Sequence, residues 1–428
     1  MDREELRDVL TALQVIIGNG PVPPEAVNIS EFSGAIGDGI VDDTLAVQRT
    51  LTYCSENNLP CYLPPHNRYL ITRELFFWGG ISMIGGPGSA FYINTSTPYV
   101  FNAGIKARQV LGEIWTGSIK DVTFRVIGSG GGRILFFWRS DGASIVHNTF
   151  YLGQSEYGPT SSGNNNNYVL NGHINCVRKN ITITDNKVFA ESDVYGSEGI
   201  GLNQWDGAVI ARNQVYGVGD DMIGIHFCDN IEICDNTLSG TDGRLYVSNS
   251  RNVVIRNNDI SRMPSVFSGL WHTGIALLYI GHEFDTTNSN YAPEHIVVEN
   301  NRLTYPEGSN DMGAAIYVYS PRNVLIKNNT VTKNSALGSI VGLHLLPFTF
   351  VNGTWTDPTG LDTQNISKVY EVEIDGNNFA AGSQALRVQM TGATCTHYVG
   401  PVFIRNNRAG SYSFICNPVQ SGNITVGM

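Results

Sequence analysis

Charged side chains are scarce in this chain, and basic ones are the scarcer kind. Of its 428 residues 15% are charged, with 27 Lys and Arg against 38 Asp and Glu, and the formal net charge is −11. The Lys and Arg residues do not gather into a cluster. Because binding to nucleic acid requires a basic face against the phosphates, this composition excludes nucleic acid as a partner.

Two further absences narrow the class of protein. No apolar run approaches the ~20 residues that a helix needs to cross a bilayer, and no signal-peptide pattern follows Met1, so we expect no membrane insertion. The seven Cys are an odd number without CxxC or metal-ligand spacing. We therefore expect no disulfide framework, no metal and no cofactor. Cys228 and Cys234 lie on neighbouring turns, and we interpret them as small core residues.

Glycine and asparagine, in contrast, are abundant. The chain has 47 Gly and frequent Asn, which is typical of many short strands joined by tight turns. From about Gly117 onward one template of an Ile/Val strand followed by Asn recurs, as in KNITITDNKVF, DGAVIARNQVY and RNVVIRNNDIS. The clean intervals between successive Asn are 27, 23 and 22 residues. The template Asn are Asn148, Asn186, Asn213, Asn236, Asn258, Asn301, Asn329, Asn378 and Asn407.

Self-similarity at this period predicts a solenoid, because a coil that cannot bury its apolar strand alone shares a core with its neighbours. An Asn at the same corner of each coil can bond its amide to the next along the axis. A leucine-rich repeat needs Leu at fixed positions and helices, whereas this chain has Ile/Val strands and Gly turns. We therefore predict an all-β fold, a single-stranded right-handed parallel β-helix with short N-terminal helices and long loop insertions.

The pattern divides the chain into three parts. Residues 1–25 hold an amphipathic helix and a linker, 26–116 an opening and cap segment, and 117–428 the β-helix. The apolar face of residues 2–17 either covers one end of the domain or forms a short oligomerising neck. Insertions interrupt the coils, and we expect them to wall a groove on one flank. They span 153–173, 262–293 and 345–365.

The most specific local motif is Ser33–Leu51, SGAIGDGIVDDTLAVQRTL. Its glycines provide tight turns, and Asp42, Asp43 and Thr44 offer an N-cap for a helix. Together with the strands in the following CYLPPHNRYLIT, this motif resembles the opening segment of pectate-lyase-like β-helices. That superfamily includes polygalacturonase-type glycosidases and many bacteriophage tailspikes. We interpret Asp42 and Asp43 as structural, since they cap a helix and tie a turn.

Acids that can carry chemistry gather within a short stretch of the repeat. Asp220 and Asp221 precede an apolar strand, and Glu198 lies 22 residues before Asp220, which is one coil, so we expect the three to lie within several ångströms. A glycosidase needs one carboxylic acid to protonate the leaving oxygen and one carboxylate to activate water or attack the sugar. Clustered acids can divide these roles, because their repulsion raises one pKa. The alternative is that the Asp pair forms a turn or a cation site.

This spacing is similar to that of polygalacturonase-type glycoside hydrolases. Those enzymes have an Asp in an Asn-Thr-Asp motif, an Asp-Asp pair one coil later, a His on the next coil and an Arg further on. The resemblance implies Asp220 as general acid, with Glu198 and Asp221 positioning the attacking water in an inverting mechanism. Here Glu198 replaces the first Asp and Asp242 replaces the His, and the distal Arg has no clear counterpart. These departures argue against galacturonan as the substrate.

Residues expected to touch a glycan flank the acids. Arg244 can provide a charged or hydroxyl contact, and His226 either orients an acid, touches substrate or is a core His. Aromatic residues in the insertions offer faces on which sugar rings stack, and anchoring of the loops is the alternative. The substrate-binding candidates are Asp242, Arg244, His226, Trp205, Asp206, Trp271 and His272.

The leading hypothesis is an endo-acting glycoside hydrolase of the phage-tailspike kind, a polysaccharide depolymerase acting on a bacterial capsule or O-antigen. The alternatives are a secreted glycosidase acting on plant or algal polymer, a polysaccharide lyase, and a non-catalytic glycan-binding spike. A lyase needs a basic residue, and only Arg244 lies near the acids, which ranks it low. By analogy with tailspikes and from the neck-like helix, we expect a homotrimer that acts outside the cell, on a virion tail or after secretion.

Overall fold

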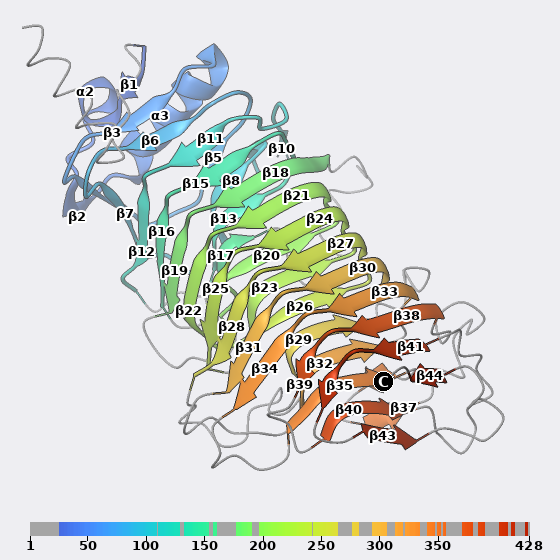
Figure 1. The fold of residues 1–428 in the computed structure, drawn as a ribbon. Helices are drawn as coiled ribbons and strands as arrows, with labels where there is room; N and C mark the ends of the chain where they lie inside the picture. Colours follow the sequence, from blue (N-terminus) through green and yellow to red (C-terminus); the bar gives the residue numbers. More distant parts are fainter. Residues whose placement is uncertain are drawn as a thin grey trace, which may run out of the picture.

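Three long parallel sheets, to which successive turns of the chain contribute strands, form the body of the computed structural model (Figure 1). The N-terminal helices lie at one end of the stack of coils, and the C-terminal strands lie at the other. The structure describes residues 25–108, 110–128, 132–153, 157–160, 177–190, 197–241, 243–263, 276–281, 293–305, 313–319, 322–333, 340–346, 349–351, 354–356, 370–379, 384–389, 402–409, 412–415 and 424–426.

Among the described residues, the first sheet has 15 strands, the second 13 and the third 12. The first sheet contains β1 Val27–Asn28, β3 Cys61–Leu63, β6 Met83–Gly85, β11 Ser118–Lys120, β15 Ser144–Val146, β18 Arg178–Thr184, β21 Asp206–Ala211, β24 Asp229–Cys234, β27 Arg251–Arg256, β30 Glu294–Glu299, β33 Arg322–Lys327, β38 Tyr370–Asp375, β41 Val402–Arg405 and β44 Ile424–Val426, with β14 Ser140–Asp141 beside β18. The second contains β2 Asp38–Asp42, β4 Arg68–Ile71, β7 Ala90–Ile93, β12 Thr123–Val126, β16 Thr149–Leu152, β19 Lys187–Ala190, β22 Gln214–Val218, β25 Thr237–Gly240, β28 Asp259–Arg262, β31 Arg302–Tyr305, β34 Thr330–Lys333, β39 Asn378–Phe379 and β42 Arg408–Ala409. The third contains β5 Leu75–Phe77, β8 Tyr99–Ala103, β13 Arg133–Phe137, β17 Tyr157–Thr160, β20 Ile200–Asn203, β23 Asp221–His226, β26 Arg244–Ser248, β29 Ala276–Gly281, β32 Gly313–Tyr319, β35 Ile340–Leu346, β40 Gln384–Gln389 and β43 Tyr412–Ile415.

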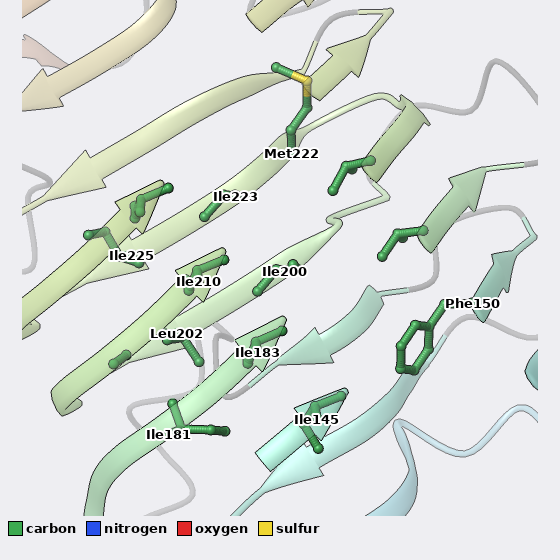
Figure 2. Packing of buried hydrophobic residues seen from close by; sticks show 14 of the residues in the cluster. Ile145, Phe150, Ile181, Ile183, Ile200, Leu202, Ile210, Met222, Ile223 and Ile225 are labelled. Carbon is green, nitrogen blue, oxygen red and sulfur yellow. The ribbon is translucent and has the colours of Figure 1, made fainter. Parts of the chain in front are cut away.

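The core follows from the alternation of side chains along these strands, which sends every second residue to the inside of the coil. Ile183 pairs with Ile210, and Ile210 pairs with Ile233, so identical side chains stack from coil to coil with no exposed surface. Strands of the third sheet add residues such as Ile200 and Ile223 to the same interior (Figure 2). Parallel pairing of coils around one apolar core is the predicted β-helix.

The predicted asparagine ladder runs along one corner of the coils. Eight of the nine ladder Asn are buried, and the last, Asn407, is partly exposed. Each Asn up to Asn377 donates its side-chain amide to the Oδ1 of the next, as Asn213 does to Asn236 at 3.0 Å. The residue before each ladder Asn has a left-handed backbone, which Asn, Asp and Gly tolerate best. The ladder consists of Asn148, Asn186, Asn213, Asn236, Asn258, Asn301, Asn329, Asn377 and Asn407.

One member of the ladder differs from the sequence prediction. Asn377 and not Asn378 bonds to Asn329 and Asn407. The reason is the preceding residue: Gly376 takes the left-handed conformation, with φ of 63°, and the ladder Asn is the residue that follows it. Asn378 therefore begins strand β39 in the second sheet.

The acids of the opening segment are structural, as predicted. Asp43 accepts hydrogen bonds from the backbone of Ile36 and Gly37, at 2.7 and 3.0 Å, and so ties the tight turn. Asp42 accepts from the backbone N of Thr44 at 3.0 Å, where the helix α3 (Thr44–Asn57) begins. Besides the three sheets, the described elements are the helices α2 Ile29–Ser33 and α3 Thr44–Asn57, and the strand pairs β9 Ile105–Ala107 with β10 Val110–Leu111 and β36 Thr349–Val351 with β37 Thr354–Thr356.

Parts of the predicted loop insertions are strands. Tyr157–Thr160 and Ala276–Gly281, which the sequence placed inside insertions, pair with their neighbours in the third sheet as β17 and β29. The predicted helix in residues 2–17 lies outside the described residues. Within the part of the chain that the structure describes, no helix is long and apolar enough to cross a membrane. Cys228 and Cys234 are buried and free, as predicted.

Candidate active site

The acidic cluster lies on the outer face of the third sheet, over a strand position that has no side chain. In β23 Ile223 and Ile225 point into the core, so Gly224 between them faces outward. A Cβ at Gly224 would lie 2.9 Å from Oε1 of Glu198 and 3.1 Å from Oδ2 of Asp221. The bare glycine therefore leaves the space that the two carboxylates occupy.

Glu198 and Asp221 come from successive coils, as the spacing of one coil predicts. Both residues are buried: Glu198 is 5% exposed and Asp221 is 6% exposed. One oxygen of each and a ring nitrogen of His226 all lie within 4.8 Å of one another. His226 Nε2 lies 4.0 Å from Asp221 Oδ2, and its Nδ1 is 2.9 Å from the Ser248 hydroxyl. The sequence and the structure agree that these acids form one cluster, and His226 belongs to it.

Arg244 has a position that the sequence did not predict. Arg244 is buried, with 8% of its surface exposed, and its Nε donates to Asp221 Oδ1 at 2.8 Å. Burial lowers the pKa of Arg244, but the carboxylate of Asp221 offsets this and raises it above the usual value, so the guanidinium stays charged. Arg244 therefore forms an ion pair with an acid of the cluster, and its expected contact with substrate stays a prediction.

A column of aromatic rings continues from the cluster along the same face. Tyr246 pairs in register with Tyr279, and Tyr279 with Tyr317. The rings are stacked, with centroids 4.7 and 6.2 Å apart, and all three residues are buried. The guanidinium of Arg244 lies 4.1 Å from the centroid of Tyr246. These contacts hold the arginine against the sheet.

Asp220 lies at the rim of the cluster. It is partly exposed, unlike Asp221 beside it. Its backbone is fixed on both sides, because its N donates to the Ser197 carbonyl at 3.0 Å and its carbonyl accepts from Arg244 N at 3.1 Å. Its carboxylate contributes to the raised pKa of Arg244. The pair predicted from the sequence therefore consists of one buried and one accessible acid.

Two other predicted binding residues do not join the cluster. Trp205 is 1% exposed and packs in the core against Phe137, with ring centroids 5.9 Å apart, and it borders the same polar pocket as Asp206. Asp206 is exposed, but it lies at the opposite end of β20 from Glu198: Asp206 follows the last residue of the strand, and Glu198 precedes the first. Asp206 accepts from Asn230 at 2.7 Å there, beside a polar pocket. Asp242, Trp271 and His272 lie outside the described residues.

The cluster has the residue types of a cation site. Within the described part of the chain, Glu198, Asp221 and His226 are the one group of three such side chains with atoms close enough to share an ion. Arg244 already balances the charge of Asp221 at 2.8 Å, and its guanidinium would repel a metal ion bound to the same carboxylate. The chemistry that fits this set is proton transfer by carboxylates.

Three residues of this face were missed by sequence reasoning. The tyrosines carry a recognisable signal, because each stands between two apolar residues in the same register, as LYV, LYI and IYV. Gly224 carries a weaker signal, since many glycines of the chain mark turns and a glycine inside a strand does not stand out among them. The missed residues are Gly224, Tyr246 and Tyr317, whereas Tyr279 is one of the insertion aromatics that the sequence analysis expected to offer a face to a sugar ring.

Comparison with known proteins identifies the fold. A family model described as "Right handed beta helix region" matches residues 169–347. The A-module of the mannuronan C-5 epimerase AlgE6 from Azotobacter vinelandii is 14% identical, with a TM-score of 0.64 over 94% of this chain and 99% of that one. The chain is a right-handed parallel β-helix. The predicted fold is thus confirmed, handedness included.

Two further solved structures share this fold. PfbA, a surface adhesin of Streptococcus pneumoniae, is 15% identical, with a TM-score of 0.61 over 91% of this chain and 92% of its own. A mutant tailspike protein of E. coli bacteriophage HK620, in complex with pentasaccharide, is 12% identical, with a TM-score of 0.53 over 94% of this chain and 80% of its own. None of the curated proteins matches the chain. The predicted resemblance to tailspikes and related β-helices is confirmed at the level of the fold.

Proposed function

We propose that this β-helix is a polysaccharide depolymerase that hydrolyses glycosidic bonds of a bacterial surface glycan. The observation that carries the proposal is the pair Glu198 and Asp221, two buried carboxylates whose oxygens lie within 4.8 Å above the bare position of Gly224. Burying two acids side by side is costly unless they share a proton, a cation or a bound water. Such a pair is typical of catalytic sites.

The spacing of the pair suits a water molecule held between the two acids. A water that donates to both at about 2.7 Å spans carboxylate oxygens up to roughly 5.4 Å apart. In the proposed reaction this water attacks the anomeric carbon while Asp220, the accessible acid at the rim, protonates the leaving oxygen. An inverting enzyme requires about 6.5–9.5 Å between its acid and its base. We expect the Asp220 carboxyl to lie in that range from the water-holding pair in the complex with substrate.

The glycan is proposed because of the fold and the face on which the acids lie. A solenoid presents a long flank on which an extended polymer can lie across several coils. Among the proteins with this fold, the epimerase is named for mannuronan and the HK620 tailspike was solved with a pentasaccharide. These names support a glycan as the ligand, and a surface glycan implies that the protein acts outside the cell, on a virion tail or after secretion.

One assay separates the proposed hydrolase from the alternatives. The protein is incubated with a panel of bacterial capsules and O-antigens and with plant and algal polymers. New reducing ends without absorbance of an unsaturated uronate support hydrolysis, and new ends with that absorbance indicate a lyase. Asp220→Asn is the matched variant, because the amide is nearly isosteric and cannot give a proton. Binding of a glycan without any new ends would replace the proposal with a glycan-binding spike.

We also propose that the chain assembles as a homotrimer. The N-terminal end carries exposed apolar side chains, with Phe32, Leu45 and Tyr53 exposed by 47%, 57% and 39%. They line one pocket on the helices α2 and α3, a surface that a second copy would cover. Sedimentation of the wild type should give a trimer, and Leu45→Asp should weaken it. Val110→Asp, at an exposed residue of the β9–β10 pair, is the control. A stable wild-type monomer at micromolar concentration would exclude the assembly.

A further inference from the structure

A ladder of flat side chains lies on the outer face of the second sheet. Arg125, Tyr151, Phe189 and Tyr216 occupy the same register position on four successive coils. The guanidinium of Arg125 lies 4.1 Å from the ring centroid of Tyr151. The rings of Tyr151, Phe189 and Tyr216 are stacked, with centroids 5.6 and 6.0 Å apart. Unlike the buried tyrosines of the third sheet, all four residues are at least partly exposed, and Tyr216 is 37% exposed.

The ladder ends at Tyr216, because the next two coils have serines in this position. Tyr216 pairs with Ser239, and Ser239 pairs with Ser261. Within the described residues, Phe189 is the one ring stacked on Tyr216, so the other face of the Tyr216 ring has no aromatic neighbour. Successive coils are about 4.7–4.9 Å apart, and flat groups stack at about 3.5–4.0 Å. A ring placed on the open face would therefore rest on Ser239, which is 9% exposed.

Tyr216 belongs to the coil that carries the acid pair. It lies four residues before Asp220, so the two Cα atoms are at most about 13–14 Å apart. The chain between them contains a bulge at Gly217, where φ is 75° and an added Cβ would lie 2.9 Å from the Ala190 carbonyl oxygen. We propose that the open face of Tyr216 is a sugar-binding subsite, on which a hexopyranose ring of the glycan stacks beside the acids.

The side chains beyond the open face suit a sugar and not an apolar partner. One face of a pyranose presents C–H groups that pack on an aromatic ring, while its hydroxyls need hydrogen-bond partners. Ser261 is partly exposed, and its hydroxyl lies 2.9 Å from that of Ser239. Thr304 and Thr332 continue the same register position, with their hydroxyls 3.1 Å apart. An apolar partner laid on this row of hydroxyls would remove them from water without replacing its hydrogen bonds.

The subsite gives the polymer a direction on the molecule, and this inference rests on the proposed function. A glycan bound at the acids reaches the Tyr216 ring with one sugar and continues along the row of hydroxyls toward the C-terminal coils. Tyr216 contacts the substrate away from the bond that is cut. Its loss should therefore raise KM and leave kcat nearly unchanged, which is the signature of an interaction made equally in the ground state and the transition state.

The subsite is tested with a simple sugar and without turnover. The tyrosines are replaced by fluorotyrosine, and the ¹⁹F signals of Tyr216 and Tyr151 are assigned through Tyr216→Phe and Tyr151→Phe. The probe is methyl β-galactopyranoside, which has three ring C–H groups on one face, added up to about 0.2 M because one stacked ring gives a Kd in the millimolar range. We expect a saturable shift of the Tyr216 signal and none at Tyr151, whose ring is covered by Arg125 and Phe189. A Tyr216 signal that moves no more than that of Tyr151 would overturn the proposal.

Ser239→Phe is the second test of the same face. The added ring would extend the ladder by one step and fill the place of the sugar, so the shift at Tyr216 should disappear in the folded variant. A shift that persists in Ser239→Phe would show that the sugar binds elsewhere. Loss of the trimer in sedimentation of Tyr216→Ala, without any sugar shift in the wild type, would identify this face as a subunit contact and refute the subsite.

Kinetics on the glycan that the wild type cleaves provide the last arm. Tyr216→Ala should raise KM roughly tenfold, Tyr216→Phe should keep the wild-type KM because it keeps the ring, and Tyr151→Ala is the control for loss of a ring from the ladder. An unchanged KM in Tyr216→Ala would refute the subsite and leave the hydrolase in place. If the wild type cleaves no glycan, the proposed hydrolysis fails, and the ¹⁹F titration still decides whether Tyr216 binds a sugar.

Discussion

Replacing Gly224 by Ala tests the site with a single methyl group. The added Cβ would lie 2.9 Å from Glu198 Oε1 and 3.1 Å from Asp221 Oδ2, whereas ordinary contact begins at 3.4 Å. The Glu198 oxygen must therefore move by about 0.5 Å and the Asp221 oxygen by about 0.3 Å. Gly224 is outside the group of glycines with positive φ, so alanine fits the backbone. The strain falls on the two carboxylates.

A displacement of this size is small for the fold and large for catalysis. A misplacement of about 1 Å costs on the order of 100-fold in rate, so we expect Gly224→Ala to lower kcat/KM by roughly 10- to 100-fold. Stability should change little, because the loss of unfolded-state entropy favours alanine by about 0.4–1 kcal/mol and offsets part of the contact strain. The measurements are reducing-end kinetics on the glycan that the wild type cleaves and thermal unfolding of both proteins.

The control is an alanine at a glycine remote from the acids. A Cβ at Gly80 would meet its nearest neighbour, Asn58 Oδ1, at 3.4 Å, which is ordinary contact. Gly80→Ala should therefore keep both the activity and the melting temperature of the wild type. If Gly224→Ala were as active as Gly80→Ala, the carboxylates over Gly224 would not be the reacting groups, and the proposed site would be wrong.

Three further predictions concern the acids, the ladder and the thiols. Asp220→Asn and Glu198→Gln should each lower turnover by about 10²–10⁴-fold and leave glycan binding intact. Asp42→Asn is the control, and it should reduce only the stability measured in denaturant titrations. Full activity of both Asp220→Asn and Glu198→Gln would show that the active site lies elsewhere. The pKa of Asp42 is lowered: burial raises it, but hydrogen bonds from Thr44 and Thr72 outweigh this, so its contribution to stability should be present above about pH 4 and be lost as pH falls through the folded value. Asn236→Ala should destabilise the fold by roughly 2–4 kcal/mol in urea unfolding, since it leaves the buried amide of Asn213 without its acceptor, and exposed Asn252→Ala should cost far less. Burial raises the pKa of Cys228 to about 12, so peptide mapping should find it unmodified by iodoacetamide at pH 8 until the protein is unfolded; rapid labelling of the native protein would contradict this packing.

The coil architecture could be predicted from the sequence because it depends on periodicity. Repeats of 22 to 27 residues with Asn at one corner determine how strands pair, and the one-coil interval from Glu198 to the Asp pair places these acids together. The misplaced ladder member, Asn378, shows the limit of this reasoning. Two adjacent Asn fit the template equally well, and only the left-handed turn at Gly376 selects Asn377.

The orientations within the site could not be predicted in the same way. The pairing of β23 with β26 shifts register between Asp221 and Ile223, and such an irregularity turns a side chain in a direction that a strict alternation does not give. Arg244 therefore points at Asp221, a contact that the sequence did not predict. Trp205 was a candidate for contact with a glycan from its place beside the acids in the sequence, whereas in the structure its side chain is buried in the core.

The asparagine ladder has a mechanical consequence. Each coil is held by one set of strand pairs and one link of the ladder, so a pulling force applied at the C-terminus loads the last coil before the others. The coil between Asn213 and Asn236 contains 23 residues, and its release would lengthen the chain by about 76–83 Å, at roughly 3.3–3.6 Å per residue. The 43 residues between Asn258 and Asn301 would give a step nearly twice as long. Stretched from its ends, this molecule would lengthen as a series of unequal steps, whose sizes record the order of its coils.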